Sequence, residues 1–293
     1  MEPFAAYVDY TADLEIFKTE KPYELYQVEG LPQSDLTNVV YEPHNIACQL
    51  EDIRGRESNF SLHEHSFCYM KHTSQVPVVE EDDMMHPYAT EVNGLLKQMF
   101  NTPHVICYDV RRRMNRPYSQ EESMSSSRSV PSPPVTLVHT DHTPSGGWGR
   151  IKRHLSDAEF RKFASGEWRA RIINVWRPIT SPVVDSPLGL CDFRTVDNDD
   201  LLASDHVSVI STVEVFQLKH NKNHHWYYLK NQTSNEICIF LAFDSHPPEK
   251  IQNYVPHAAI TLPFCPPTTV PRESIETRSI VFTPVTPATP VND

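Results

Sequence analysis

Glycine is scarce in this sequence and proline is abundant. The 293 residues include 8 glycines and 25 prolines. Neither the GxGxxG pattern of dinucleotide-binding folds nor the GxxxxGK[ST] pattern of phosphate-binding loops is present. Both patterns use glycine to bring the backbone close to phosphate groups. The composition therefore argues against a glycine-rich phosphate cradle, and the prolines predict many stiff connecting segments.

Basic residues, long apolar runs and paired cysteines are also in short supply. The formal net charge is −12, and because phosphate contacts need a basic face we expect no nucleic-acid partner. No apolar run approaches the roughly 20 residues of a membrane span, and Met1–Phe4 does not open a secretory signal. The six cysteines form no CxxC pair, which favours free thiols in a reducing cytoplasm.

What the sequence does contain predicts a mainly β fold with appended helices. Hydrophobic residues make up 39% of the chain, enough for a sizeable core. Seven or eight strands with few helices are expected from Val135 onward, which is typical of a jelly roll, two antiparallel sheets around a cavity. Helices are expected at about 80–101 and from Ser156, with Glu159 at the capping-box position, and a turn is expected at Pro144–Gly147. The clearest strands are expected at 105–111, 169–179, 188–196, 207–218, 236–243 and 274–282.

The same patterns divide the chain into four parts. Residues 1–119 are expected to form strands and helices that pack on a catalytic core at 135–282. Between them lies a Ser- and Pro-rich loop, 120–134, which is either a lid or an inert insertion. Residues 283–293 form a Thr-Pro-rich tail that we expect to be disordered.

A histidine and an aspartate stand two residues apart after the β-prone run Val135–Val138. In an extended strand, residues i and i+2 point to the same face, so His139 and Asp141 are able to reach one metal ion. Two such ligands and a distant histidine make the facial triad that binds Fe(II) and leaves positions open for dioxygen and a co-substrate. The alternative is that this short pattern arises by chance.

The best third ligand is His257, because it sits in a short β segment between Pro256 and two small alanines. No other histidine has so strand-like a setting. The competitors are His142, His206, His224, His225 and His246.

A co-substrate with a distal carboxylate needs a fixed cation. Arg272 precedes the last strand, and Ser274 lies on the same strand parity, so the two side chains offer a bidentate charged pair and a hydroxyl donor. Arg278 shares this parity and is the rival anchor. The alternative for either arginine is a surface salt bridge with Glu273 or Glu276.

Two further patterns have open interpretations. The basic run Arg111–Arg113 favours a solvated strand end over a ligand-binding site. Asn174 and Trp176 share one face of the strongest strand, but alternation alone does not decide whether that face or the opposite one lines the cavity.

The C-terminal half of the chain resembles the fungal asaB-type hydroxylase/desaturase family, which includes gibberellin desaturase-like proteins. The resemblance implies a non-haem Fe(II)- and 2-oxoglutarate-dependent oxygenase of secondary metabolism on a double-stranded β-helix. It implies that His139, Asp141 and His257 bind the iron, that Arg272 and Ser274 bind 2-oxoglutarate, and that dioxygen oxidises a small-molecule substrate. The matching stretches are His139–Asp141, Ile172–Pro178, Pro187–Leu188, Leu190–Asp192, His225–Tyr228, Phe243–Ser245, Pro256–Ala259 and Pro271–Glu276.

The chain departs from this family in a longer insertion at 120–134 and in the segment Pro263–Pro267, and both departures bear on substrate shape. Two other classes of function stay open at this point. One is a non-catalytic jelly-roll binding protein, and the other is a cupin-like metalloenzyme, such as an isomerase, that does not use 2-oxoglutarate. The oligomeric state is open as well, and a homodimer is compatible with the sequence.

Overall fold

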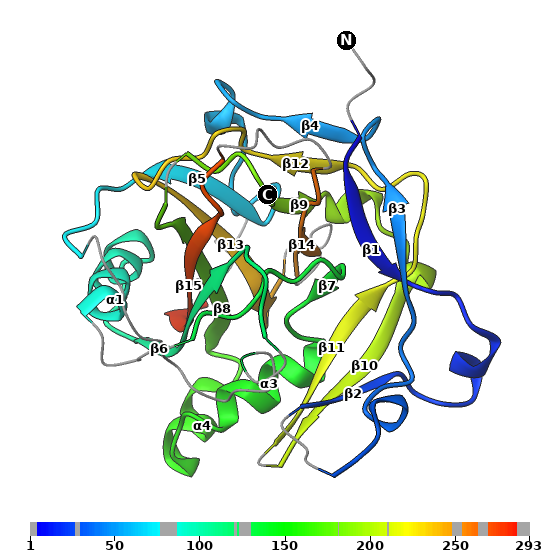
Figure 1. Ribbon diagram of the computed structural model, residues 1–293. Coiled ribbons are helices and arrows are strands. Elements are labelled where there is room, and N and C mark those ends of the chain that lie inside the picture. The colour runs from blue at the N-terminus through cyan, green and yellow to red at the C-terminus, as the bar shows by residue number, and fades with distance from the viewer. Residues whose placement is uncertain are drawn as a thin grey trace, which may run out of the picture.

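Two large β-sheets dominate the computed structural model (Figure 1). It describes residues 5–26, 30–76, 87–119, 122, 130–180, 182–209, 211–247, 254–262 and 269–285. The eight-stranded sheet has the order β2 (Tyr23–Tyr26), β10 (Leu201–Ser208), β11 (Ser211–Leu218), β7 (His139–Thr140), β14 (His257–Ala259), β9 (Leu188–Cys191), β12 (Trp226–Tyr228) and β4 (Leu50–Asp52). The five-stranded sheet has the order β5 (Phe67–Lys71), β13 (Glu236–Asp244), β8 (Trp168–Pro178), β15 (Glu273–Pro284) and β6 (Val105–Met114). This is the jelly roll expected from the sequence.

The remaining elements flank the two sheets. A separate two-stranded ribbon pairs β1 (Tyr7–Thr11) with β3 (Tyr41–Asn45). The α-helices are α1 (Pro87–Met99), α3 (Pro144–Lys152) and α4 (Asp157–Phe163), and short 3-10 helices lie at Glu15–Lys18, Gln33–Asp35, Glu57–Asn59, Phe193–Thr195 and Asn198–Asp200. Within the described ranges, no helix has both the length and the apolar character needed to cross a membrane.

Strand β8 decides which face of the five-stranded sheet looks inward. Ile173 and Val175 pack in one apolar cluster with Val92 and Leu96 of α1, which covers the outer side of this sheet (Figure 1). Because side chains alternate along a strand, Asn174 and Trp176 point to the other side, toward the cavity. Their common face is therefore the inner one, and Trp176 lines a cleft on that side.

The predicted turn at Pro144–Gly147 is wrong, because these residues begin α3. Thr143 caps the helix by accepting a hydrogen bond from the Gly146 backbone N–H at 3.0 Å, and Pro144 occupies the first turn, where a missing N–H costs nothing. A Pro-Ser-Gly-Gly tract resembles a turn, but here the glycines serve close packing. A Cβ on Gly146 would lie 2.1 Å from the Glu214 carbonyl oxygen. The predicted capping box of Ser156 and Glu159 at the start of α4 is confirmed.

Several expected boundaries differ in detail. The strand predicted at 188–196 ends at Cys191 and continues as a 3-10 helix, because Asp192 caps that helix by accepting from the Arg194 N–H. The last strand extends past Phe282 to Pro284. Several expected features lie outside the described residues. They are residues 120–121 and 123–129 of the loop, the acidic run Glu80–Asp83, the segment Pro263–Pro267 and the tail from residue 286, so the four-part division stays a prediction.

Candidate metal and co-substrate site

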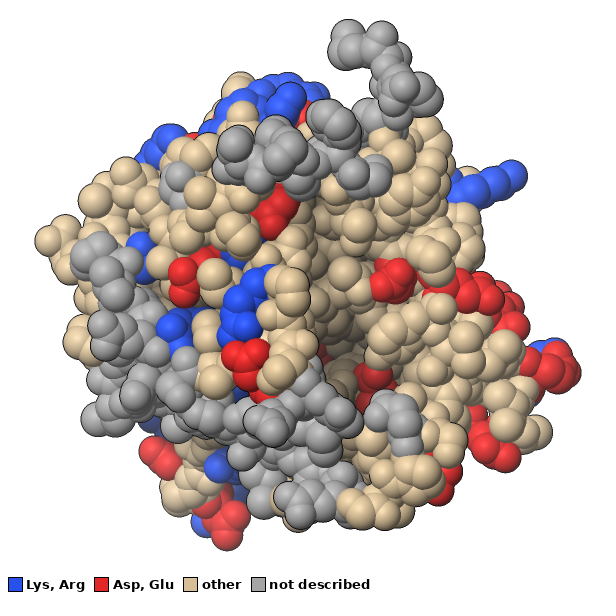
Figure 2. Space-filling view, viewed as in Figure 1, with Lys and Arg blue, Asp and Glu red and all other residues tan. Residues whose placement is uncertain are grey.

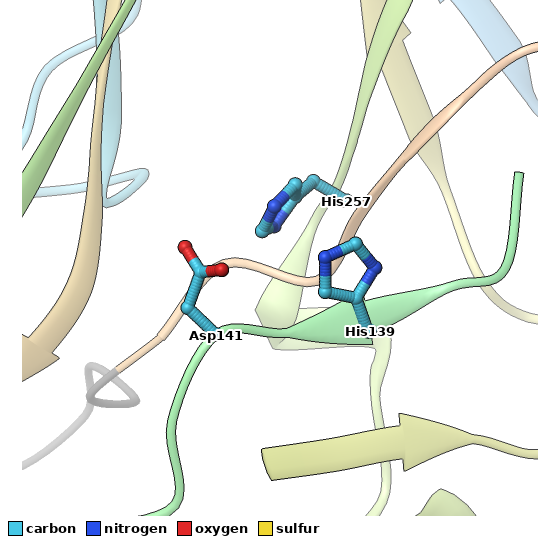
Figure 3. Close-up of side chains that lie close together, drawn as sticks. All are labelled: His139, Asp141 and His257. Atoms are coloured by element: carbon cyan, nitrogen blue, oxygen red, sulfur yellow. The ribbon is translucent and has the colours of Figure 1, made fainter. Parts of the chain in front are cut away.

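His139, Asp141 and His257 converge at one point between the two sheets (Figure 3). Each offers a ligand atom, and these atoms all lie within 4.8 Å of one another. His139 begins β7, Asp141 follows that strand, and His257 begins β14, where it is the register partner of His139. The i and i+2 residues thus reach the same side, as the strand geometry predicts, and the strand pairing supplies the distant histidine.

Backbone carbonyls orient both imidazoles. His139 Nδ1 lies 2.8 Å from the Leu137 carbonyl oxygen, and His257 Nδ1 lies 2.9 Å from that of Val255. A carbonyl only accepts hydrogen bonds, so each Nδ1 carries the proton and each Nε2 keeps a free lone pair, which is how proteins prepare histidine for a metal ion. Burial, and next the proximity of His257, lower the pKa of His139 to about 3, so this ring is neutral at pH 7.

The competing histidines have other partners. His142 Nε2 lies 3.3 Å from the Tyr108 hydroxyl, and His246 is exposed and bonded to Ser245. His206, His224 and His225 are paired with Glu24, Asp200 and Glu51, respectively. None belongs to a group of three or more metal-binding side chains within the described part of the chain.

Asp141 is held as a carboxylate by two residues of the opposite sheet. The Asn174 side-chain amide donates to Asp141 Oδ2, and Arg278 Nη2 lies 3.2 Å from Asp141 Oδ1. Burial alone would raise the pKa of Asp141, but the Arg278 guanidinium, followed by His257 and His139, holds it well below its usual range. An ionised oxygen donor therefore faces the imidazoles of His139 and His257.

Arg278 forms ion pairs with three carboxylates. Besides Asp141, its guanidinium contacts Asp109 Oδ2 at 2.8 Å and Glu276 Oε1 at 2.6 Å. Arg278 does pair with Glu276, as the salt-bridge alternative supposed, but the ion pair lies inside the protein and not on its surface. Few donors of Arg278 remain for a co-substrate.

Arg272, by contrast, is buried and forms no ion pair among the described residues. Its Nη1 donates to the Ser186 carbonyl oxygen at 2.5 Å, and its guanidinium lies 5.6 Å from the centre of the Trp176 ring. Arg272 Nε and Ser274 Oγ are both buried and have no hydrogen-bond partner in the part of the chain that the structure describes. Burial, and next the charge of Arg113, lower the pKa of Arg272 to about 9, which still leaves it protonated at pH 7.

His139, His257 and Arg272 line one cleft. The cleft opens to solvent, and the space within it and at its mouth is about 350 Å³. Figure 2 shows the surface hollowed between the two sheets. Its lining comprises Arg113, Val135, His139, Trp176, Leu188, His257, Ala258, Ala259, Arg272, Glu276 and Arg278. Arg113 was not expected here, because the register that brings β6 beside β15 cannot be read from the sequence.

Comparisons with known proteins support the fold and the chemistry of the site. A family model described as an "Oxidoreductase/YMDC permease-like domain" matches residues 7–282. The Fe(II)/2-oxoglutarate-dependent dioxygenase nvfI of Aspergillus novofumigatus is 30% identical over 265 residues, which cover 88% of this chain and 90% of the relative. The hydroxylase/desaturase CTB9 of Cercospora beticola is 29% identical over 261 residues, covering 83% of this chain and 77% of the relative.

A solved structure agrees over nearly the whole chain. The iron and alpha-ketoglutarate-dependent endoperoxidase NvfI matches with a TM-score of 0.78 and 25% identity, over 96% of this chain and 98% of the other. The family resemblance noted in the sequence is thereby confirmed over a longer span than residues 135–282. The chain belongs to the family of fungal Fe(II)/2-oxoglutarate-dependent dioxygenases and hydroxylase/desaturases.

Proposed function

We propose that His139, Asp141 and His257 bind Fe(II), and that Arg272 and Ser274 bind the distal carboxylate of 2-oxoglutarate. The observation that carries the assignment is the convergence of three ligand atoms within 4.8 Å, with both histidines oriented by carbonyl groups. Two imidazole nitrogen donors and one carboxylate suit non-haem Fe(II) and leave positions open for other ligands.

The cleft also suits the co-substrate. An unpaired buried charge is costly, so a carboxylate in an enclosed cleft needs a fixed cation. Arg272 supplies a planar cation held by Ser186 and Trp176, and its Nε together with Ser274 Oγ provides donors that have no partner in the described protein. The anchor is therefore in place before the ligand binds.

The protein is an Fe(II)- and 2-oxoglutarate-dependent oxygenase of secondary metabolism, with dioxygen as co-reactant and a small molecule as substrate. With 2-oxoglutarate and dioxygen, bound iron supplies an oxidant able to remove hydrogen from a C–H bond, which leads to hydroxylation, desaturation or oxidative cyclisation. The side chains around the cleft orient the substrate and exclude water. A cytoplasmic location, a homodimer, and the absence of nucleic-acid and membrane partners belong to the same proposal.

Two other classes of function fit less well. A non-catalytic binding protein has no use for an oriented set of two histidines and one carboxylate. An isomerase without 2-oxoglutarate leaves the buried donors of Arg272 and Ser274 unexplained. The relatives, moreover, are named as dioxygenases and hydroxylase/desaturases.

Anaerobic titration tests the metal site directly. Adding Fe(II) and then 2-oxoglutarate to the wild-type protein should produce the visible charge-transfer band of the ternary complex. His257→Ala should abolish both the band and turnover while the fold survives, because one of three protein ligands is lost. His246→Ala is the matched control, since this histidine is exposed, and it should behave as wild type. A His257→Ala protein that retains the band would refute the assignment.

The co-substrate anchor needs its own test. Arg272→Ala should raise the apparent KM for 2-oxoglutarate by a factor on the order of 100, because losing a charge-assisted pair in a buried site costs roughly 3 kcal/mol. The KM for the organic substrate should change far less. If Arg278→Ala gave this selective defect and Arg272→Ala did not, the anchor would lie six residues further along the chain.

A further inference from the structure

Arg113 stands directly beside the co-substrate anchor. It lies on β6, where its register partner on β15 is Ser274. Side chains directly opposite each other on paired antiparallel strands share a face, with Cβ atoms about 4.5–5.5 Å apart. Arg113 and Arg272 also line the same cleft. Two guanidinium groups and the Ser274 hydroxyl thus gather in one part of the inner surface.

Arg113 has spare donors for a ligand. Its Nη1 donates to the Pro133 carbonyl oxygen at 2.8 Å, and no carboxylate pairs with it among the described residues. The carboxylate nearest this position in the cleft lining, Glu276, is paired with Arg278 at 2.6 Å. Most of the Arg113 guanidinium is therefore available to another group.

Two like charges in one cleft attract an anion. Arg113 is among the charges that lower the pKa of Arg272, so the two cations repel each other. Arg272 and Ser274 are 3% and 1% exposed, and each has an unpartnered polar atom. Leaving buried donors and like charges unsatisfied is unfavourable, whereas one carboxylate between them would satisfy all three groups.

We propose that Arg113 is a second cation of the anchor and binds the distal carboxylate of 2-oxoglutarate together with Arg272 and Ser274. The inference rests on the proposed function. It adds to the proposed site a residue of β6, a strand outside the predicted catalytic core. The basic run Arg111–Arg113, interpreted from the sequence as a solvated strand end, thereby contributes one residue to the site.

Calorimetric titration without turnover tests the proposal. Protein loaded with Mn(II) in place of iron is titrated with 2-oxoglutarate and with 2-oxopentanoate, which has the same chain length but no distal carboxylate. Arg113→Gln should weaken 2-oxoglutarate binding by about 10- to 100-fold, the usual effect of losing a hydrogen bond to a charged group. The weaker binding of 2-oxopentanoate should be the same in variant and wild type. Arg113→Lys, which keeps the charge, should restore part of the affinity.

Arg111→Gln is the matched control, because Arg111 lies on the same strand and pairs with Asp109. It should bind 2-oxoglutarate as wild type does. If Arg113→Gln bound 2-oxoglutarate as tightly as wild type, or lost both ligands equally, the inference would be overturned. If the wild-type protein with Mn(II) bound no 2-oxoglutarate at all, the proposed function itself would fail, whatever the behaviour of Arg113.

Discussion

Asp141 illustrates how much of a metal site depends on residues that touch no metal. The backbone of Asp141 directly follows a strand of the eight-stranded sheet. Asn174 and Arg278 of the five-stranded sheet each bind one of the Asp141 carboxylate oxygens. These two residues are register partners on β8 and β15. The pair fixes the carboxylate plane and keeps it ionised, so we expect Asn174 and Arg278 to act as positioning residues for the proposed metal ligand.

Removing Arg278 should therefore weaken metal binding more than co-substrate binding. Arg278→Gln should lower the affinity for Fe(II) by about 10- to 100-fold, as losing the partner of a metal ligand commonly does. Competition with a chelator under anaerobic conditions measures this change, and Arg278→Lys should recover part of it. A suitable control is Arg169→Gln, which breaks an ion pair with Asp244 and should leave iron affinity unchanged. Unchanged iron affinity in Arg278→Gln would argue against the positioning role.

At the scale of one element, α3 contains two kinds of glycine. Gly146 has no room for a side chain, because a Cβ would lie 2.1 Å from the backbone oxygen of Glu214, whereas Gly149 has no atom within 4 Å of such a Cβ. Gly146→Ala should therefore lower the free energy of unfolding by about 1–3 kcal/mol through overpacking. Gly149→Ala should raise it by roughly 0.5–1 kcal/mol through better helix propensity. Urea denaturation measures the free energy of unfolding of both variants. The same change in both would contradict the packing argument.

Strand β13 begins with a buried carboxylate that links three segments. Glu236 contacts Arg54 at 2.5 Å and Lys71 at 2.6 Å, and it accepts from the Thr233 backbone N–H. Burial would raise the pKa of Glu236, but Arg54 and then Lys71 lower it to about 2. A depressed folded-state pKa gives stability that is complete above the unfolded value near 4.5 and is lost as the pH falls toward 2.

Glu236→Gln should reveal this dependence. At pH 7 the variant should unfold with a free energy lower by up to about 3 kcal/mol, because the charged partners lose their carboxylate. The difference between variant and wild type should shrink as the pH falls from 4.5 toward 2, since the wild-type carboxylate is then protonated. Denaturant titrations at pH 7 and pH 3 measure it. A difference that stayed constant with pH would show that the loss comes from packing alone.

Local patterns predicted local features well. The capping box of Ser156 and Glu159 needs only residues three apart, and the strand around Ile172–Val175 needs only β-prone side chains. The helix at Pro144 was missed because the close approach of Glu214 to Gly146 comes from a strand far along the chain. The inner position of Arg113 depends on strand register in the same way. Register is set by tertiary packing, which one sequence does not display.

At the scale of the whole molecule, the candidate site joins the two sheets. The side chains proposed to bind the metal come from β7, the segment after it and β14, all on the eight-stranded side. Arg272 directly precedes β15 and Ser274 is the second residue of that strand, on the five-stranded side. Iron and 2-oxoglutarate bound to each other would therefore connect both halves of the jelly roll, and binding should stabilise the fold as a whole.

Ligand removal should reverse that stabilisation in two separable steps. A ligand that binds only the folded state adds about 2.7 kcal/mol at 100 times its Kd, so Mn(II) and then 2-oxoglutarate should each raise the free energy of unfolding. Chelation of the metal should remove both increments, because the co-substrate needs the ion as its second attachment.

His257→Ala should lose the response to metal and therefore to 2-oxoglutarate. Arg272→Ala should keep the stabilisation by Mn(II) and lose most of the stabilisation by 2-oxoglutarate, because the five-stranded sheet no longer holds the distal carboxylate. If 2-oxoglutarate stabilised Arg272→Ala as much as wild type, the ligand would be held from the metal side alone, and the connection between the sheets would not run through Arg272.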